Sequence, residues 1–206
     1  MADWTLHVLI DPKQVPLDGV DNLCRALRDG GATVAQLRGK HSDGGELIRY
    51  GEAFRRATRD TGILFIVNDR VDIAMAVQAD GVHVGQDDIP VEVVRRLAPN
   101  LIVGLSVGSE AELRVAERAR PDYIGMGPVY PTPSKDDAGE ALNVDGFRRL
   151  CLRAKRLAPV VAIGGIQPDN AKPVWESGAD GIAVISAVMG APDKRAACFA
   201  LLASRG

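Results

Sequence analysis

Residues 81–88 read GVHVGQDD, and this short stretch holds the pattern that decides the fold. Its first half, 81–84, is a brief apolar run of the kind that forms a buried strand. Its second half supplies Gln86, Asp87 and Asp88, polar residues that packing alone would not choose at that position. Short apolar runs followed by polar residues recur along the chain, and this repetition is what predicts the architecture.

Apolar runs alternate with longer amphipathic stretches from one end of the chain to the other. We predict eight strands at 5–11, 32–38, 63–68, 81–84, 101–106, 122–126, 160–164 and 181–185, each followed by a helix. Most runs are continuously apolar, as expected for parallel strands covered on both faces. The unbroken series predicts a single-domain (β/α)8 TIM barrel over residues 1–206, with an open doubly wound sheet as the alternative.

Local signals agree with this register. Ser109 followed by Glu112 predicts a capping box at the fifth helix, and Pro90 is expected just inside the fourth. The connection at 127–143 is the one long loop and is a candidate lid.

Composition limits the function classes. The 206 residues are 46% hydrophobic with a formal net charge of −2, which indicates one large core and argues against nucleic acid as a partner. The three cysteines are isolated, so neither a disulfide framework nor a zinc site is expected. The first ten residues lack a basic leader and no apolar run is long enough to span a bilayer. We therefore expect a soluble protein of the cytoplasm.

Charged residues follow several predicted strands, and the carboxyl ends of barrel strands converge on one face. Arg38, Lys40 and Lys135 are positive there, while Asp69 and Asp88 are negative. Carboxylates beside a polyphosphate would repel it, and a shared Mg²⁺ removes that conflict. The alternative is that both aspartates only cap helices. The amino ends of the strands show no comparable cluster.

The last two units predict a second anion site. Gly164 and Gly165 allow close approach of backbone N–H groups, and Ser186 begins the segment after the eighth strand, which suits a phosphate monoester. A tight turn is the alternative. His83 can be an acid or base, or a hydrogen-bonded wall residue. Gln36 can bind an aminated heterocycle or tie strands together.

Six motifs in order resemble the thiamine-phosphate synthase family over essentially the whole chain. They are QLRGK at 36–40, VNDR at 67–70, DGVHVGQDD at 80–88, GPVYPTPSK at 127–135, IGGI at 163–166 and GIAVIS at 181–186. Three positions depart from the common pattern of that family: Ser134 replaces a frequent threonine, Gly39 an acidic residue and His7 an aromatic one.

The resemblance implies an enzyme that joins hydroxymethylpyrimidine pyrophosphate to hydroxyethylthiazole phosphate with Mg²⁺ and releases pyrophosphate. It assigns the pyrophosphate to Arg38, Lys40, Asn68, Ser106 and Lys135, and the metal to Asp69 and Asp88. It places Gln36 and His83 against the pyrimidine. It assigns the thiazole phosphate to Thr132, Ser134, Gly164, Gly165, Ile185 and Ser186. The groups expected to act in catalysis are Lys135, Arg38 and Ser106.

The implied reaction needs no strong base, because the thiazole nitrogen already has a lone pair. The enzyme has to stabilise a departing anion and align two ligands. Two alternatives stay open at this point, a thiazole tautomerase-like isomerase and a non-catalytic barrel that binds a phosphorylated ligand. Neither needs Asp88 together with the 132–135 segment.

Overall fold

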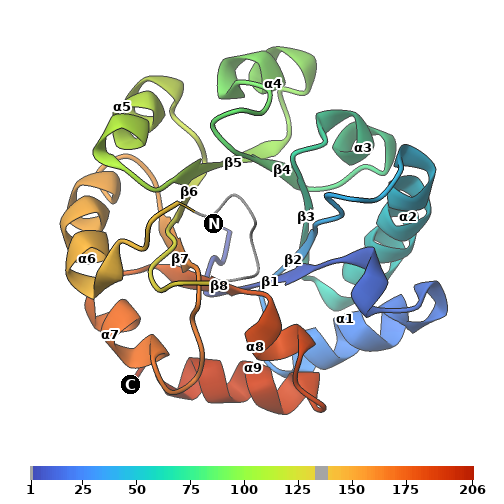
Figure 1. Ribbon diagram of the computed structural model, residues 1–206. Coiled ribbons are helices and arrows are strands. Elements are labelled where there is room, and N and C mark those ends of the chain that lie inside the picture. The colour runs from blue at the N-terminus through green and yellow to red at the C-terminus, as the bar shows by residue number, and fades with distance from the viewer. Residues whose placement is uncertain (1, 133–138) are drawn as a thin grey trace.

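The computed structural model describes residues 2–132 and 139–206 and has the predicted closed barrel of parallel strands, with helices around it (Figure 1). In the described residues each strand pairs with its neighbours in chain order, and β8 closes the ring against β1. The strands are β1 Leu6–Ile10, β2 Val34–Leu37, β3 Leu64–Asn68, β4 Gly81–Val84, β5 Ile102–Val107, β6 Tyr123–Met126, β7 Val160–Ile163 and β8 Gly181–Val184. Their ends lie within two residues of the predicted runs.

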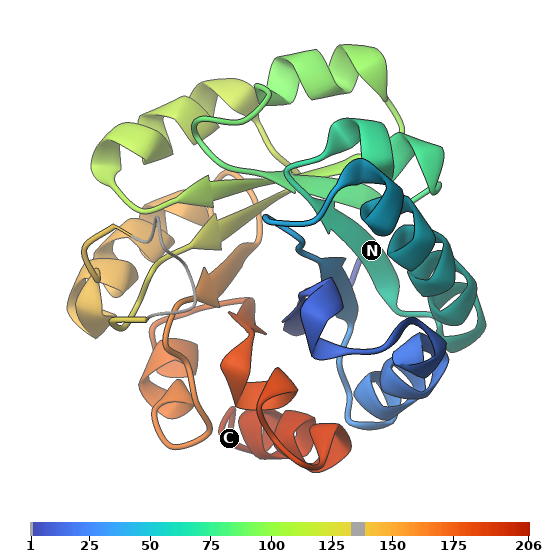
Figure 2. The same cartoon turned by 45° about the vertical axis from the view of Figure 1, so that its right-hand side comes forward.

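The helices form the outer layer, as the turned view also shows (Figure 2). They are α1 Val20–Asp29, α2 Gly44–Thr61, α3 Val71–Ala76, α4 Val91–Leu97, α5 Glu110–Ala119, α6 Asn143–Ala154, α7 Ala171–Glu176, α8 Ser186–Met189 and α9 Lys194–Ala203. Two 3₁₀ turns, Pro12–Gln14 and Leu17–Gly19, precede α1. In the described part of the chain, none of the helices combines the length and apolar character needed to cross a membrane.

The prediction of one helix after each strand is wrong at the end of the chain. Two helices, α8 and α9, follow β8. Gly190 ends the first of them, and the side chain of Asp193 accepts a hydrogen bond from the backbone N–H of Ala196 at the start of the second. Pro192 lies between these two signals and, lacking an N–H, cannot continue a helix from the preceding turn.

Both faces of the strands are buried, which explains their continuous apolar character. Val8 and Val184 pack with the helices in the main core, whereas Leu9, Tyr123, Val161 and Ala183 form a second cluster inside the barrel. Neighbouring residues of one strand, such as Val8 and Leu9, therefore point to opposite faces and pack in different cores. Trp4 stacks on Tyr123 with ring centroids 4.5 Å apart, as expected for a packing residue.

Two helix-start predictions need correction. Pro90 is the N-cap of α4 and lies one residue before the helix, because its extended backbone precedes the first helical residue. Ser109 does cap α5, accepting from the N–H of Glu112. The carboxylate of Glu112 accepts from the N–H of Gly108 at 2.7 Å, one residue upstream of the N–H that a capping box would use.

The amino ends of the strands carry polar residues that are spread around the ring and do not form a cluster like that at the carboxyl ends. The residues just before β2, β4, β6 and β8 each accept a hydrogen bond from a backbone N–H at the start of the preceding strand. These residues are Thr33, Asp80, Asp122 and Asp180, and their donors are Leu6, Phe65, Val103 and Val160. Each aspartate also pairs with a cation, from Arg55, Arg95 and Lys155 respectively. The pattern is spread around the ring and is fully used in holding strands together.

Candidate active site

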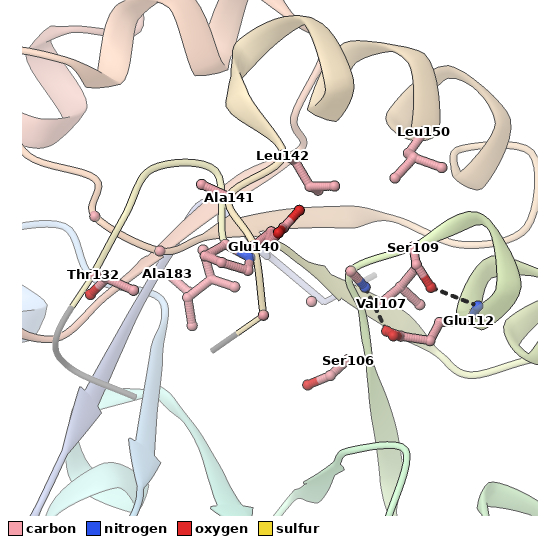
Figure 3. A pocket seen from close by; sticks show the side chains of 18 of the residues that line it. Ser106, Val107, Ser109, Glu112, Thr132, Glu140, Ala141, Leu142, Leu150 and Ala183 are labelled. Atoms are coloured by element: carbon pink, nitrogen blue, oxygen red, sulfur yellow. Dashed lines mark hydrogen bonds between the residues drawn. The ribbon is translucent and has the colours of Figure 1, made fainter. Parts of the chain in front are cut away.

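A cavity of about 810 Å³ opens at the carboxyl ends of the strands, on the side of β4 to β8. Several residues that were predicted to bind substrate line this cavity: Ser106, Thr132, Gly164, Gly165, Ile185 and Ser186. Figure 3 shows Ser106, Thr132 and Ala183 bordering this space from three different strands or the segments after them. The size suits a small organic ligand with its phosphate group.

A second, much smaller cavity of about 30 Å³ lies deeper, inside the barrel. Gln36, Asn68 and His83 line it, and Ser106 borders both cavities. The side-chain oxygen of Gln36 is buried and has no hydrogen-bond partner among the described residues. An unpartnered buried acceptor costs free energy, so this oxygen is available to a ligand that brings a donor.

The two glycines after β7 are required by their surroundings. Gly164 and Gly165 have φ angles of 102° and 65°, in the left-handed region that other residues rarely adopt. A Cβ atom on Gly165 would also lie 2.8 Å from the carbonyl oxygen of Pro131. The backbone after β7 therefore lies directly against the segment after β6. The side-chain amide of Asn170 donates to the Gly165 carbonyl at 3.0 Å and fixes this turn.

Asp69 and Asp88 come together, although they follow different strands. Burial raises the pKa of Asp69 to about 6, and the charge of Asp88 and hydrogen bonding with it act in the same direction. Lys40 and Arg38 lie close enough to oppose that rise. The structure thus brings four of the five predicted charges to one place, outside the lining of either cavity, while the fifth, Lys135, lies outside the described residues.

The helix-cap alternative for these aspartates does not hold. The N-cap of α3 is Arg70, and no side chain caps that helix. Asp88 accepts a hydrogen bond from the N–H of Gly85 at 2.7 Å, which closes the turn after β4 ahead of α4. Asp69 has a φ of 62°, and its N–H donates to the carbonyl of His83 at 2.7 Å, so its backbone is fixed by the neighbouring strand.

His83 is hydrogen bonded at both ring nitrogens. Nδ1 lies 2.9 Å from the hydroxyl of Tyr123, and Nε2 lies 2.9 Å from the hydroxyl of Ser106. The wall-residue interpretation of His83 therefore fits its contacts, and Tyr123 is a site residue that the sequence analysis missed. Its position inside an apolar strand gave no sign of this contact.

Several other lining residues were given no role by the sequence analysis. Gln86 and Asp87 were noted as polar residues after the fourth strand, and both line the larger cavity. Glu140 lies on the loop before α6 and Arg149 on α6, where no strand-end pattern reaches. Ser134 and Lys135 lie outside the described residues, as does most of the middle of the candidate lid.

The fold and this cavity define the class: a (β/α)8 barrel with a polar pocket at the carboxyl ends of its strands. A sequence model described as thiamine monophosphate synthase matches residues 6–188. The chain is 48% identical over 198 residues to a thiamine-phosphate synthase of Moorella thermoacetica, covering 96% of this chain and 93% of that one. It is 47% identical over 192 residues to the Pyrococcus furiosus enzyme of the same name, covering 93% and 90%.

A solved structure agrees with the sequence relatives. The thiamine phosphate pyrophosphorylase from Pyrococcus furiosus superimposes with a TM-score of 0.87 at 42% identity, covering 99% of this chain and 96% of that one. The chain belongs to the thiamine monophosphate synthase family. It is a transferase of thiamine biosynthesis with thiamine-phosphate synthase activity, and it acts on small molecules.

Proposed function

We propose that the chain joins hydroxymethylpyrimidine pyrophosphate to hydroxyethylthiazole phosphate by dissociative substitution at the pyrimidine methylene. The observation that carries this proposal is the meeting of Asp69, Asp88, Arg38 and Lys40 beside a cavity at one barrel mouth. These four charges suit a pyrophosphate leaving group with its metal ion. The part of the cavity formed by the turns after β7 and β8 suits a phosphate monoester.

The leaving group is held by Arg38, Lys40, Asn68 and Ser106, together with Lys135 from the segment after β6. One feature of the described residues supports this assignment: the Nε of Arg38 is buried and has no hydrogen-bond partner. A guanidinium N–H left in this way can donate to a phosphate oxygen. Lys135 adds charge that is used mainly as the pyrophosphate separates, which makes Lys135, Arg38 and Ser106 the catalytic groups.

The residues present fit a Mg²⁺ ion. Two carboxylates meet at Asp69 and Asp88, and burial and then the charge of Asp88 raise the pKa of Asp69. Within 2–132 and 139–206, no group of three or more His, Cys, Asp or Glu side chains could hold a metal, so two carboxylates with phosphate oxygens and water would complete the coordination. When bound, Mg²⁺ would neutralise charge on the pyrophosphate.

The pyrimidine occupies the space between the two cavities. Its exocyclic amino group can donate to the side-chain oxygen of Gln36, which is buried and unpartnered in the described residues. His83 contributes one wall, with its ring fixed by Tyr123 and Ser106. The thiazole phosphate is placed on Thr132, Ser134, Gly164, Gly165, Ile185 and Ser186.

The chemistry then needs alignment more than proton transfer. The bond from the methylene carbon to the pyrophosphate oxygen breaks, and the electron pair leaves with the pyrophosphate. The resulting cation is delocalised over the aminopyrimidine, and the lone pair of the thiazole nitrogen forms the new C–N bond. Arg38 and the other donors stabilise the separating anion, and the fixed walls hold the two rings in line.

The setting of the reaction is also part of the proposal. Residues 1–206 act as one catalytic unit in the cytoplasm. Cys24, Cys151 and Cys198 are all buried and unpaired, which supports a reducing compartment.

The test is to mix both substrates with purified protein in the presence of Mg²⁺ or of EDTA. We expect equal amounts of thiamine phosphate and pyrophosphate with Mg²⁺ and neither product with EDTA. Asp88→Asn should lower turnover strongly, whereas Asp72→Asn, an exposed aspartate on α3 paired with Arg70, should not. Full activity in EDTA would overturn the metal assignment. Rearranged thiazole phosphate without pyrophosphate would mean an isomerase.

A further inference from the structure

Three side chains form a connected line across the barrel interior. The Tyr123 hydroxyl on β6 lies 2.9 Å from Nδ1 of His83 on β4, and Nε2 of His83 lies 2.9 Å from the Ser106 hydroxyl on β5. Tyr123 is 1% exposed, whereas Ser106 lines the larger cavity. The line therefore runs from the buried interior of the barrel to the proposed substrate.

Two glycines make room for this line. Gly104 on β5 lies in register between His83 and Tyr123, and a Cβ atom there would collide with Nδ1 of His83 and Cζ of Tyr123. A Cβ atom on Gly125 of β6 would lie 2.8 Å from Cε1 of His83. Any larger residue at either position would displace the imidazole. The strands around His83 are thus built to hold its ring in this place.

The contacts fix the direction of each hydrogen bond. Among the described residues, His83 is the one hydrogen-bond partner of the Tyr123 hydroxyl. Burial raises the pKa of Tyr123, so the phenol keeps its proton. If this hydroxyl accepted from Nδ1, its own buried proton would have no acceptor, which costs about 1–3 kcal/mol. Tyr123 therefore donates to Nδ1.

The rest of the line follows from that first bond. With Nδ1 acting as acceptor, the neutral imidazole carries its proton on Nε2 and donates it to the oxygen of Ser106. The Ser106 oxygen then accepts from within the protein, and its own proton points away from His83 toward the cavity. A serine hydroxyl without this neighbour would rotate among several directions.

We propose that Tyr123 and His83 are positioning residues that hold the Ser106 hydroxyl as an oriented hydrogen-bond donor for the pyrophosphate leaving group. This inference rests on the proposed function, in which Ser106 contacts the pyrophosphate. A donor whose direction is set beforehand does not have to reorganise as charge develops on the leaving oxygen, so its benefit falls on the chemical step. Tyr123 and His83 act through Ser106 and need not touch the leaving group themselves.

The kinetic test is a double-mutant cycle with Tyr123→Phe and Ser106→Ala, assayed by pyrophosphate release. Tyr123→Phe keeps the ring that stacks on Trp4. It should lower kcat by roughly fivefold to tenfold with KM nearly unchanged, as expected when the orientation of one hydrogen bond is lost. In the Ser106→Ala background the same change should have no further effect. Additive effects of the two changes would overturn the proposal.

A matched control comes from Tyr50, whose hydroxyl donates to the carbonyl of Val15 at 2.9 Å, away from the site. Tyr50→Phe also removes one partly buried phenol hydrogen bond. We expect it to leave kcat and KM unchanged, so a fall equal to that of Tyr123→Phe would show a general loss of stability and overturn the positioning role.

A spectroscopic measurement needs no variant at position 123. Nitrogen NMR of imidazole-labelled protein should show His83 protonated at Nε2 and unprotonated at Nδ1, with its signals assigned by comparison with His7→Phe and His41→Gln. A proton on Nδ1 would overturn the proposal. If the wild-type protein releases no pyrophosphate from the two substrates, the proposed function fails, and the NMR result still decides the orientation separately.

Discussion

The two ends of the barrel both carry charged side chains, but they differ in how those charges are arranged. At the amino end, Asp80 accepts from a backbone N–H and pairs with Arg55 at 2.8 Å, and the same arrangement recurs at Asp122 and Asp180. At the carboxyl end, the carboxylate of Asp69 lies against that of Asp88. Charges paired with an opposite charge hold the fold together, whereas crowded like charges are available to a cation or a ligand.

His7 on β1 tests this distinction, because its Nε2 is buried without a hydrogen-bond partner among the described residues, and its side chain lines the smaller cavity. Burial is the main cause that lowers the pKa of His7 from 6.5 to about 3, and Asp3 has a smaller opposing effect. Trp4 and Tyr123 are the aromatic side chains packed against it. Between pH 6.5 and about 3, His7 is therefore neutral in the folded state and protonated in the unfolded chain.

Stability should fall as pH drops from 6.5 toward 3, because the unfolded chain then binds a proton that the folded state excludes. His7→Phe removes this dependence, a difference on the order of 4 kcal/mol at pH 3. Urea denaturation at pH 7, 5 and 3 measures it, with His41→Gln on an exposed loop as the control. Parallel curves for wild type and His7→Phe would show that His7 is not held neutral.

Asp69→Asn tests the carboxyl end and should separate activity from stability. Asparagine tolerates the φ of 62° at this position, so the backbone should not change. Turnover with Mg²⁺ should fall by roughly two orders of magnitude, comparable to losing one preorganised electrostatic contact. The unfolding midpoint without divalent cation at pH 7.5 should rise, because the variant no longer buries a charged carboxylate beside that of Asp88. A fall in both quantities would mean that Asp69 is structural.

Asp80→Asn makes the same chemical change at the amino end, where we expect the opposite outcome. It removes the charge that pairs with Arg55, whose side chain is 13% exposed. The free energy of unfolding should fall by about 2 kcal/mol, while kcat and KM stay unchanged. Asp29→Asn, in an exposed pair with Arg28 at 3.8 Å, is the control and should change little. Lost activity in a folded Asp80→Asn protein would contradict the separation of the two ends.

Sequence reasoning found the barrel because hydrophobic patterning reports burial directly. It found the strand-end residues because parallel strands bring their carboxyl ends together. It placed Asp80 and Asp88 at opposite ends of the same strand, but it could not show what Asp80 does, since its partner Arg55 lies on another element, α2. It also missed Tyr123, because a tyrosine inside an apolar run looks like a packing residue until its hydroxyl is placed beside His83.

The polar contacts at the amino end recur at every second strand, through Thr33, Asp80, Asp122 and Asp180. Each contact joins an odd-numbered strand to the even-numbered strand that follows it: β1 to β2, β3 to β4, β5 to β6 and β7 to β8. In the described residues, the junctions between these pairs have the parallel ladder without this extra contact. The eight strands are therefore divided into four pairs, each held by one side chain in addition to its backbone ladder.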